Sequence, residues 1–193
     1  MAHGQHGLTR DGAISGALLA IDGEIQGNLS KGLYSVALVI IDDVINFDNQ
    51  AGYQTAVKLA GSGGSDNWLP LDKHEPGYKE ALVSHRDSEV ASLDDAWDWL
   101  TGGGPQHPPQ SISVVLVSNI GPCDGCKQRI INFRNYVTQH FPGVSVQVES
   151  VYAQAGASSK PGTRGDEKIA TTYGYPNIAA SQLDGRQVWR HVI

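Results

Sequence analysis

The sequence predicts a single α/β domain in which helices cover a mixed central sheet of about five strands. Two apolar runs, at residues 33–41 and 112–117, are short and rich in β-branched side chains, which is typical of strands buried on both faces. Two longer stretches, 84–100 and 123–141, carry apolar residues at intervals of three and four, as amphipathic helices do. Strands that alternate with helices imply one sheet covered by helices. A chain of 193 residues is long enough for one such domain.

The N-terminal part contains one expected helix and two expected strands. Residues 1–30 are rich in glycine, and we expect them to be partly flexible or to form a first helix around 14–21, ahead of the core of the domain. Asp42-Asp43 and the polar residues that follow the first strand provide turn chemistry. Residues 53–59 then alternate between apolar and polar side chains. We therefore expect 53–59 to pair with the first strand as a hairpin.

The remaining elements follow from local pattern. Ser84 is the expected cap of the first long helix, which runs to about Leu100, and the second long helix ends before Pro142-Gly143. The other predicted elements are a loop at 61–77, the strand at 112–117, a strand at 144–151, a loop at 153–165 and a last strand at 186–192. The pattern leaves open whether the last strand runs parallel or antiparallel to its neighbour.

Composition limits the classes of protein to which the chain can belong. No apolar run approaches the roughly 18 to 20 residues of a membrane-spanning helix, so we expect no membrane partner. The start has no basic region followed by an apolar one, which predicts a cytoplasmic protein or a toxin domain delivered as part of a larger effector. A formal net charge of −6 disfavours a broad basic face for duplex DNA. A local cleft can still attract a strand, and its candidate cations are Lys127, Arg129, Arg134, Lys160 and Arg164.

The two cysteines, Cys123 and Cys126, lie three positions apart where a buried strand ends and a helix begins. Two cysteines are too few for a disulfide-stapled scaffold, so a redox pair or a metal pair remains. The backbone N–H groups and the dipole at the start of a helix stabilise thiolates, and two thiolates one turn apart can share one zinc ion. Two sulfur ligands leave a zinc ion half-ligated, so other ligands are expected from elsewhere.

The start of the preceding helix, at residues 85–89, is the candidate source of the missing ligand. If the two long helices lie side by side on one face of the sheet, their N-termini converge at the same edge. His85 or Asp87 would then reach the metal held by the cysteines, and a fourth position would stay open for water, as a catalytic zinc requires.

These segments resemble the signature of the zinc-dependent cytidine-deaminase superfamily, in which H-x-E is followed by P-C-x-x-C. Pro122-Cys123-Asp124-Gly125-Cys126 matches the second half in full. The first half departs from the pattern, because Asp87 stands two residues before Glu89 where the signature has histidine, and His85 stands four before. Asp87 can replace the histidine, since carboxylates bind zinc, or His85 can bind from the helix cap. Both alternatives remain open at the level of the sequence.

The resemblance implies a three-layer deaminase-like fold, with a catalytic core at 31–193, and it is strongest to bacterial toxin-type nucleic-acid deaminases. It implies hydrolytic deamination of cytosine in DNA, single- or double-stranded, by a zinc-activated water, with Glu89 as general acid and base. DNA is a more plausible substrate than RNA, and a toxin would also have an immunity protein as partner. Backbone groups of Gly121 and Pro122 would meet the exocyclic amine. The expected substrate contacts are Asn46 and Asn49 on the sugar or base edge and Tyr53, Trp68 or Tyr152 stacking on the base.

Other functions compete with this interpretation. The cysteines alone are also compatible with a thioredoxin-like redox pair or with a purely structural zinc site. Within enzymes, the acidic charge permits a deaminase of free nucleosides or nucleotides, and an adenine or guanine substrate is a further alternative. Outside enzymes, the rival is a non-catalytic, zinc-stabilised binding module.

Overall fold

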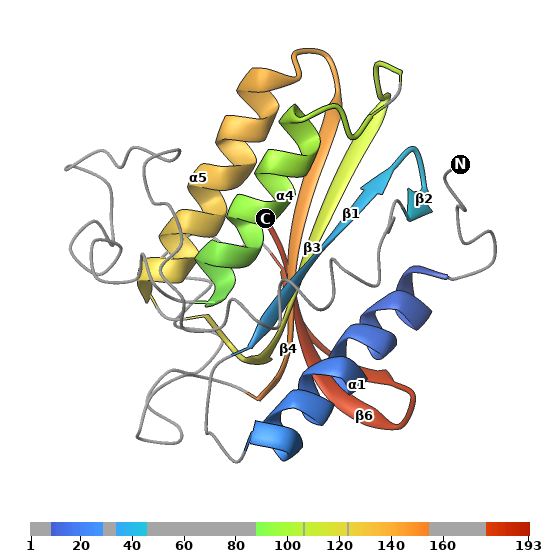
Figure 1. Ribbon diagram of the computed structural model, residues 1–193, viewed down its shortest axis with the longest axis vertical. Coiled ribbons are helices and arrows are strands. Elements are labelled where there is room, and N and C mark those ends of the chain that lie inside the picture. Colours follow the sequence, from blue (N-terminus) through green and yellow to red (C-terminus); the bar gives the residue numbers. More distant parts are fainter. Residues whose placement is uncertain (1–8, 29–33, 46–87, 106, 123, 155–176) are drawn as a thin grey trace.

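A computed structural model describes residues 9–28, 34–45, 88–105, 107–122, 124–154 and 177–193 (Figure 1). In this part of the chain, three helices accompany six strands. Their order and bounds are α1 Arg10–Asn28, β1 Ser35–Ile41, β2 Val44–Ile45, α4 Ser88–Thr101, β3 Ser111–Ile120, α5 Asp124–His140, β4 Ser145–Gln154, β5 Asn177–Leu183 and β6 Arg186–Val192. Among these helices, none has the length and apolar character needed to cross a membrane.

The strands form one mixed sheet in the order β2-β1-β3-β4-β6-β5. Only β3 and β4 pair in parallel, and the other neighbours are antiparallel. The prediction of an α/β fold with a mixed sheet is therefore confirmed, but the described residues hold six strands and not about five. The last strand, β6, has the predicted bounds and runs antiparallel to β4.

Two tight hairpins add strands that were not predicted, β2 and β5. Asp184 and Gly185 both have positive φ, 49° and 78°, as a two-residue turn that joins twisted strands requires, and they connect β5 to β6. Asp42 and Asp43 do the same between β1 and β2, with φ of 50° and 62°. The turn was predicted at Asp42-Asp43, but its partner strand begins directly at Val44. The predicted second strand at 53–59 lies outside the described residues.

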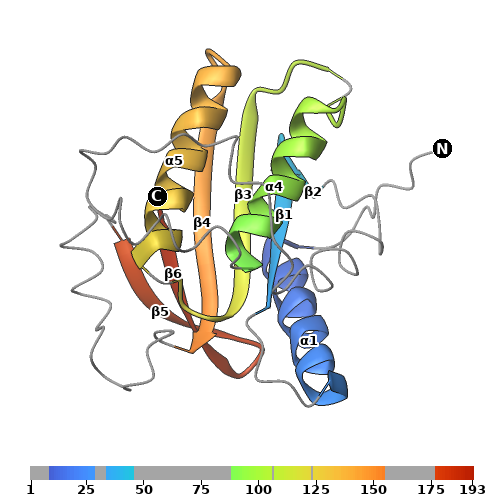
Figure 2. The ribbon, with the colours of Figure 1, turned by 60° about the vertical axis from the view of Figure 1, so that its left-hand side comes forward.

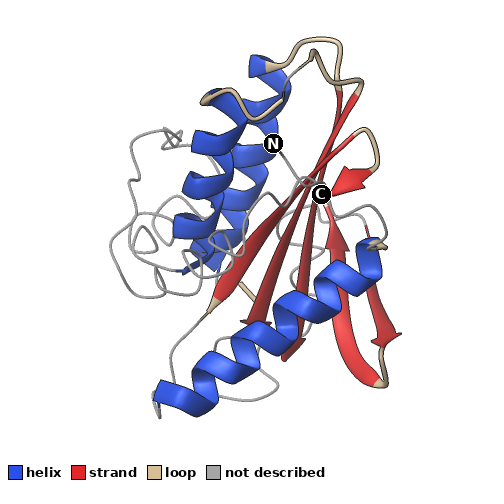
Figure 3. Ribbon diagram, turned by 45° about the vertical axis from the view of Figure 1, so that its right-hand side comes forward, coloured by secondary structure: helices blue, strands red, loops and turns tan. Residues whose placement is uncertain are grey.

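Helices cover both faces of the sheet, α1 one face and α4 with α5 the other (Figures 1 and 3). Because side chains alternate along a strand, β1 sends Val36 and Leu38 towards different neighbours from those of Val39 and Ile41. The strand at 33–41 is thus buried on both faces, as predicted. Each fully buried large apolar side chain stabilises the fold by roughly 1.5–3 kcal/mol relative to an exposed one.

Helix α1 is longer than the predicted segment at 14–21. Thr9 caps it, since its Oγ1 accepts a hydrogen bond of 3.1 Å from the Gly12 backbone N–H. The glycines that made the segment look irregular are tolerated because α1 buries a complete apolar stripe against the sheet. This stripe consists of Ala13, Ile14, Ala17, Leu18 and Ile21.

Ion pairs join α1 to strands β4 and β6. The buried carboxylate of Glu149 in β4 lies 2.6 Å from Arg10 of α1 and 3.6 Å from Arg190 of β6. Arg186 of β6 lies 2.6 Å from Asp22 of α1. A buried carboxylate is stable only with such partners, so these pairs fix the position of α1 on the sheet.

Candidate active site

The first turns of α4 and α5 lie at the same end of the sheet. Helix α4 precedes β3 and α5 follows it, so both helices run antiparallel to β3 and parallel to each other. They contact each other and pack on the same face (Figures 1 and 2). Their N-termini therefore meet where β3 ends, which is the arrangement that the sequence analysis required for a shared site.

Glu89 is the second residue of α4, and only 2% of it is exposed. The Ser88 hydroxyl donates a hydrogen bond of 3.3 Å to Glu89 Oε2. A carboxylate in the first turn of a helix interacts favourably with the helix dipole. In a site this buried, the carboxylate is shielded from solvent, and its interactions with nearby charge are stronger than in water.

Cys126 is the third residue of α5 and is 1% exposed. In general, the dipole and the free backbone N–H groups at the start of a helix favour the thiolate form of a cysteine in its first turn. Gly121 and Pro122, which connect β3 to the cysteine segment, are also buried. These two residues, which we call the linker, therefore lie in the interior of the protein, immediately after the end of β3.

A backbone clamp holds the end of β3 in place. The Asn119 side-chain oxygen accepts a hydrogen bond of 2.9 Å from the Tyr34 backbone N–H. In return, the Asn119 backbone N–H donates to the Tyr34 carbonyl at 3.2 Å. The residue before β1 is thus tied to the penultimate residue of β3, which fixes the end of the strand from which the chain continues towards α5.

A pair of buried serines holds the start of α4 on β1. Ser92 Oγ lies 2.8 Å from Ser35 Oγ and 3.0 Å from the Ser35 carbonyl. Ser92 is one turn beyond Glu89, so its hydrogen bonds to Ser35 hold the first turn of α4 against strand β1. The sequence analysis did not identify Ser35 and Ser92. The available signal was a serine on each of two surfaces that are otherwise apolar.

Most of the predicted metal and substrate residues cannot be placed. Of the predicted site, the structure describes Glu89, Cys126, Gly121 and Pro122. The other members lie outside the described residues, and they are Cys123, His85, Asp87, Asn46, Asn49, Tyr53 and Trp68. Within the described ranges, no three His, Cys, Asp or Glu side chains gather to hold a metal ion. A buried thiol at the start of α5 is nevertheless a donor of the type that zinc binds.

Two predicted nucleic-acid contacts are corrected by the structure. Tyr152 is 0% exposed, and its hydroxyl lies 2.6 Å from His191 Nε2, so its ring is packed in the interior and does not present a face on which a base can stack. Arg129 is 3% exposed and is therefore not a surface cation for a strand. Arg134 is half-buried. Lys160, Arg164 and the side chain of Lys127 lie outside what the structure describes.

No protein-family model matches the chain, and no curated protein or solved structure matches it either.

Proposed function

We propose that this protein is a zinc-dependent hydrolase that deaminates cytosine to uracil in DNA, as toxin-type deaminases do. One observation carries the proposal. A carboxylate and a thiol, Glu89 and Cys126, are both buried in the first turns of two neighbouring parallel helices where β3 ends. A carboxylate is seldom fully buried in a protein, and a buried ionisable group at a helix terminus is a candidate functional group. Helices on both faces of a mixed sheet also agree with the three-layer fold that the resemblance implies.

The donors around this site suit zinc. Cys126 and Cys123 would hold the ion, with His85 or Asp87 as third ligand. When bound, zinc would supply an activated water for hydrolysis. Glu89 is proposed to stay off the metal, because its role requires a carboxylate that can gain and lose a proton.

Glu89 would transfer the protons of the reaction. As general base it would take a proton from the attacking water, and as general acid it would deliver protons to the ring nitrogen and the leaving ammonia. Its burial supports this role, because a carboxylate screened from bulk water keeps the proton within the site. The hydrogen bonds between Ser92 and Ser35, which hold α4 on β1, would keep this carboxylate in one position.

The linker before α5 would meet the base. Proline has no backbone N–H, so the Gly121–Pro122 peptide offers only its carbonyl, an acceptor that suits the donor N–H₂ group of cytosine. Because the chain carries a formal net charge of −6, a DNA strand would depend on local cations and not on a broad basic face.

Metal analysis combined with a deamination assay tests the proposal. The purified chain should contain about one zinc ion, as a single-site deaminase does. Incubation with a cytosine-containing oligonucleotide should yield uracil, and cytidine should react more slowly. Glu89→Gln should lower kcat by about 10²- to 10⁴-fold, the usual contribution of general acid–base catalysis, and should retain zinc.

Asp98→Asn is the matched control, because it makes the same change from acid to amide near the opposite end of α4 and should leave turnover unchanged. Reaction of cytidine alone would instead assign the chain to the free-nucleoside deaminases. Zinc without any deamination would leave a structural binding module, and a chain without zinc that forms a disulfide would favour the redox pair.

A further inference from the structure

Strand β5 forms one edge of the sheet and, among the described strands, pairs with β6 alone (Figure 2). All seven of its residues, Asn177–Leu183, are in register with β6. The opposite edge of the sheet is β2, which has only two residues. In the described part of the chain, β5 is therefore the long edge of the sheet.

The sequence of β5 lacks the features that usually keep other strands away from an edge. Such features are charged side chains, prolines, bulges and a short length. The strand reads N-I-A-A-S-Q-L, without a charged residue, a proline or a glycine. Its register with β6 is continuous over its whole length, so the strand contains no bulge. Strand β5 can therefore accept a further strand, whereas the two-residue β2 is too short to do so.

Alternate residues of β5 direct their backbone N–H and C=O groups away from β6. The turn Asp184-Gly185 has two residues, so the flanking pair Leu183 and Arg186 is hydrogen-bonded, and every second pair along the hairpin is as well. The remaining residues of β6 should then face β4, and the Ile193 backbone N–H does donate to the Val148 carbonyl at 2.8 Å. The residues of β5 whose backbone groups point outwards are Ile178, Ala180 and Gln182.

These three residues are arranged symmetrically about Ala180. If a second β5 lies antiparallel with Ala180 opposite Ala180, then Ile178 of each copy lies opposite Gln182 of the other. Each of these pairs can exchange both N–H···O=C bonds, as a hydrogen-bonded pair of an antiparallel sheet does. A single two-fold axis therefore satisfies every outward backbone group of both strands.

Charge and closure also favour a second copy of the chain as the occupant. Because β5 carries no ionisable side chain, two copies place no like charges opposite each other. An interface formed by the same strand on both copies closes on itself. Further copies cannot add at the other edge, because β2 is only two residues long. Pairing at β5 therefore ends at a dimer and does not continue into a filament.

We propose that β5 is a dimerisation edge, at which a second copy of this chain adds its own β5 antiparallel, about a two-fold axis at Ala180. One strand pair buries less surface than the roughly 1,200–2,000 Å² of a standard interface, so the dimer should be weak, with a Kd on the order of 10 µM. The proposal does not depend on the deaminase activity, because β5 contributes no residue to the candidate active site.

Sedimentation equilibrium and amide hydrogen exchange on the full chain test the proposal. The mass should rise from that of a monomer to that of a dimer between about 1 and 100 µM protein. Salt should strengthen the dimer, because it screens the repulsion between two chains of net charge −6. At the high concentration, the amides of Ile178, Ala180 and Gln182 should exchange about 10-fold more slowly. The amides of Ala179 and Ser181, which already bond to β6, should change much less.

Variants at Ala180 separate this edge from other contacts. Ala180→Pro removes an outward N–H without removing a bond to β6, so it should weaken the dimer at least about 10-fold. Ala180→Val, which keeps the N–H, is the matched control and should still dimerise. Ala180→Lys and Ala180→Glu each place like charges opposite each other, so each alone should be monomeric. An equal mixture of the two should dimerise, which requires residue 180 to lie opposite itself.

Three results would overturn the proposal. A chain that stays monomeric at 100 µM and high salt has no such edge contact. A dimer that survives Ala180→Pro and both charged variants is held together elsewhere. Slow exchange at Ile178, Ala180 and Gln182 that does not depend on protein concentration would show that another segment of the same chain covers the edge. Circular dichroism of each variant verifies that it is folded.

Discussion

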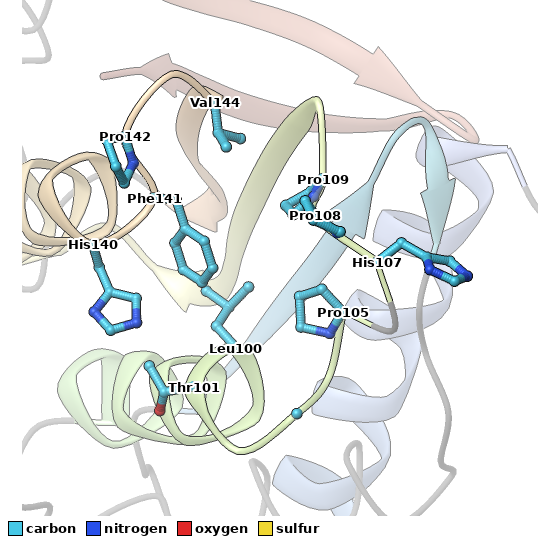
Figure 4. A pocket seen from close by; sticks show the side chains of 11 residues that line it. Leu100, Thr101, Pro105, His107, Pro108, Pro109, His140, Phe141, Pro142 and Val144 are labelled. Atoms are coloured by element: carbon cyan, nitrogen blue, oxygen red, sulfur yellow. The ribbon is translucent and has the colours of Figure 1, made fainter.

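The two ends of the α4–α5 helix pair bury different kinds of side chain. At the N-terminal end the interior holds polar, charged or reactive side chains beside the apolar Val90, Ala91 and Ile130, and these are Ser88, Glu89, Ser92, Cys126 and Arg129. At the C-terminal end the two helices enclose Leu100 and Val137, and a proline-walled cavity remains open between the loops (Figure 4). Burying polar groups lowers stability unless each finds a partner. The N-terminal end therefore buries several polar and reactive groups, which the proposed site requires, whereas the C-terminal end is an apolar core with a surface opening.

Removal of zinc should affect the two ends unequally, and this is the largest difference between them that we expect. The proposed ligands all lie before or within the first turns, so metal binding would stabilise that end by several kcal/mol. After chelation, amide hydrogen exchange at residues 88–92 and 124–129 should speed up by about 100-fold, whereas residues 97–101 and 136–140 should change by less than about threefold. Equal acceleration at both ends would show that the metal, if present, supports the whole domain.

Truncation in the shared core should weaken both ends together. Phe133 is fully buried in the middle of α5, so Phe133→Ala should lower the free energy of unfolding by about 3–5 kcal/mol. Urea denaturation measures this loss, and zinc content per folded chain should stay unchanged. Phe133→Leu, which keeps most of the volume, should lose much less. A loss of zinc from the folded alanine variant would show that packing at Phe133 also shapes the proposed metal site.

The serine pair should couple the N-terminal end to β1. Ser35 and Ser92 are both fully buried and share one hydrogen bond, so removal of either hydroxyl leaves the other without it. Ser35→Ala and Ser92→Ala should each destabilise by about 1–3 kcal/mol, and the double variant should cost less than their sum. In the deamination assay Ser92→Ala should lower kcat more than it changes KM. Strictly additive stability losses would exclude the proposed coupling.

The C-terminal end should gain stability when Asp95 is neutralised, which is the smallest effect. Its pKa is raised above 3.8, chiefly by burial and also by Asp98, so the folded state binds the proton more tightly than the unfolded state. The folded state is thus favoured below pH 3.8 and penalised as pH rises through the folded-state pKa. Asp95→Asn should raise the unfolding temperature at pH 7, and the gain should shrink as pH falls towards 3.8. Asp98→Asn should give a smaller gain, because repulsion is the lesser cause.

The local sequence pattern predicted the bounds and burial of an element well where that element buries a continuous apolar surface. Residues 186–192 were predicted with the bounds of β6, and 112–117 lies within β3. The runs at 33–41 and 112–117 predicted burial on both faces because their side chains are apolar at successive positions. Strand β5 was missed although Asp184-Gly185 is a strong hairpin signal, since the preceding residues are not rich in β-branched side chains.

The candidate site was predictable in part. Cys126 was identified from its spacing to Cys123, and Glu89 from the resemblance to the deaminase signature. The structure buries both at one end of the sheet. Tyr152 was predicted to stack on the base because it is aromatic, and Arg129 to attract a strand because it is basic. Pattern gave no sign of the His191 partner 39 residues away that accommodates Tyr152 in the interior.

The sequence by itself determined most of the described strands and helices and the place of the cysteine motif between a strand and a helix, because periodicity and turn residues act over a few positions. Tertiary structure alone decided that α4 and α5 share one face and bring their first turns together. It also decided that Ser35 meets Ser92 and that prolines from two separate segments enclose one cavity. These features depend on strand order and helix packing, which arise from contacts between residues far apart in the chain and leave no local signal.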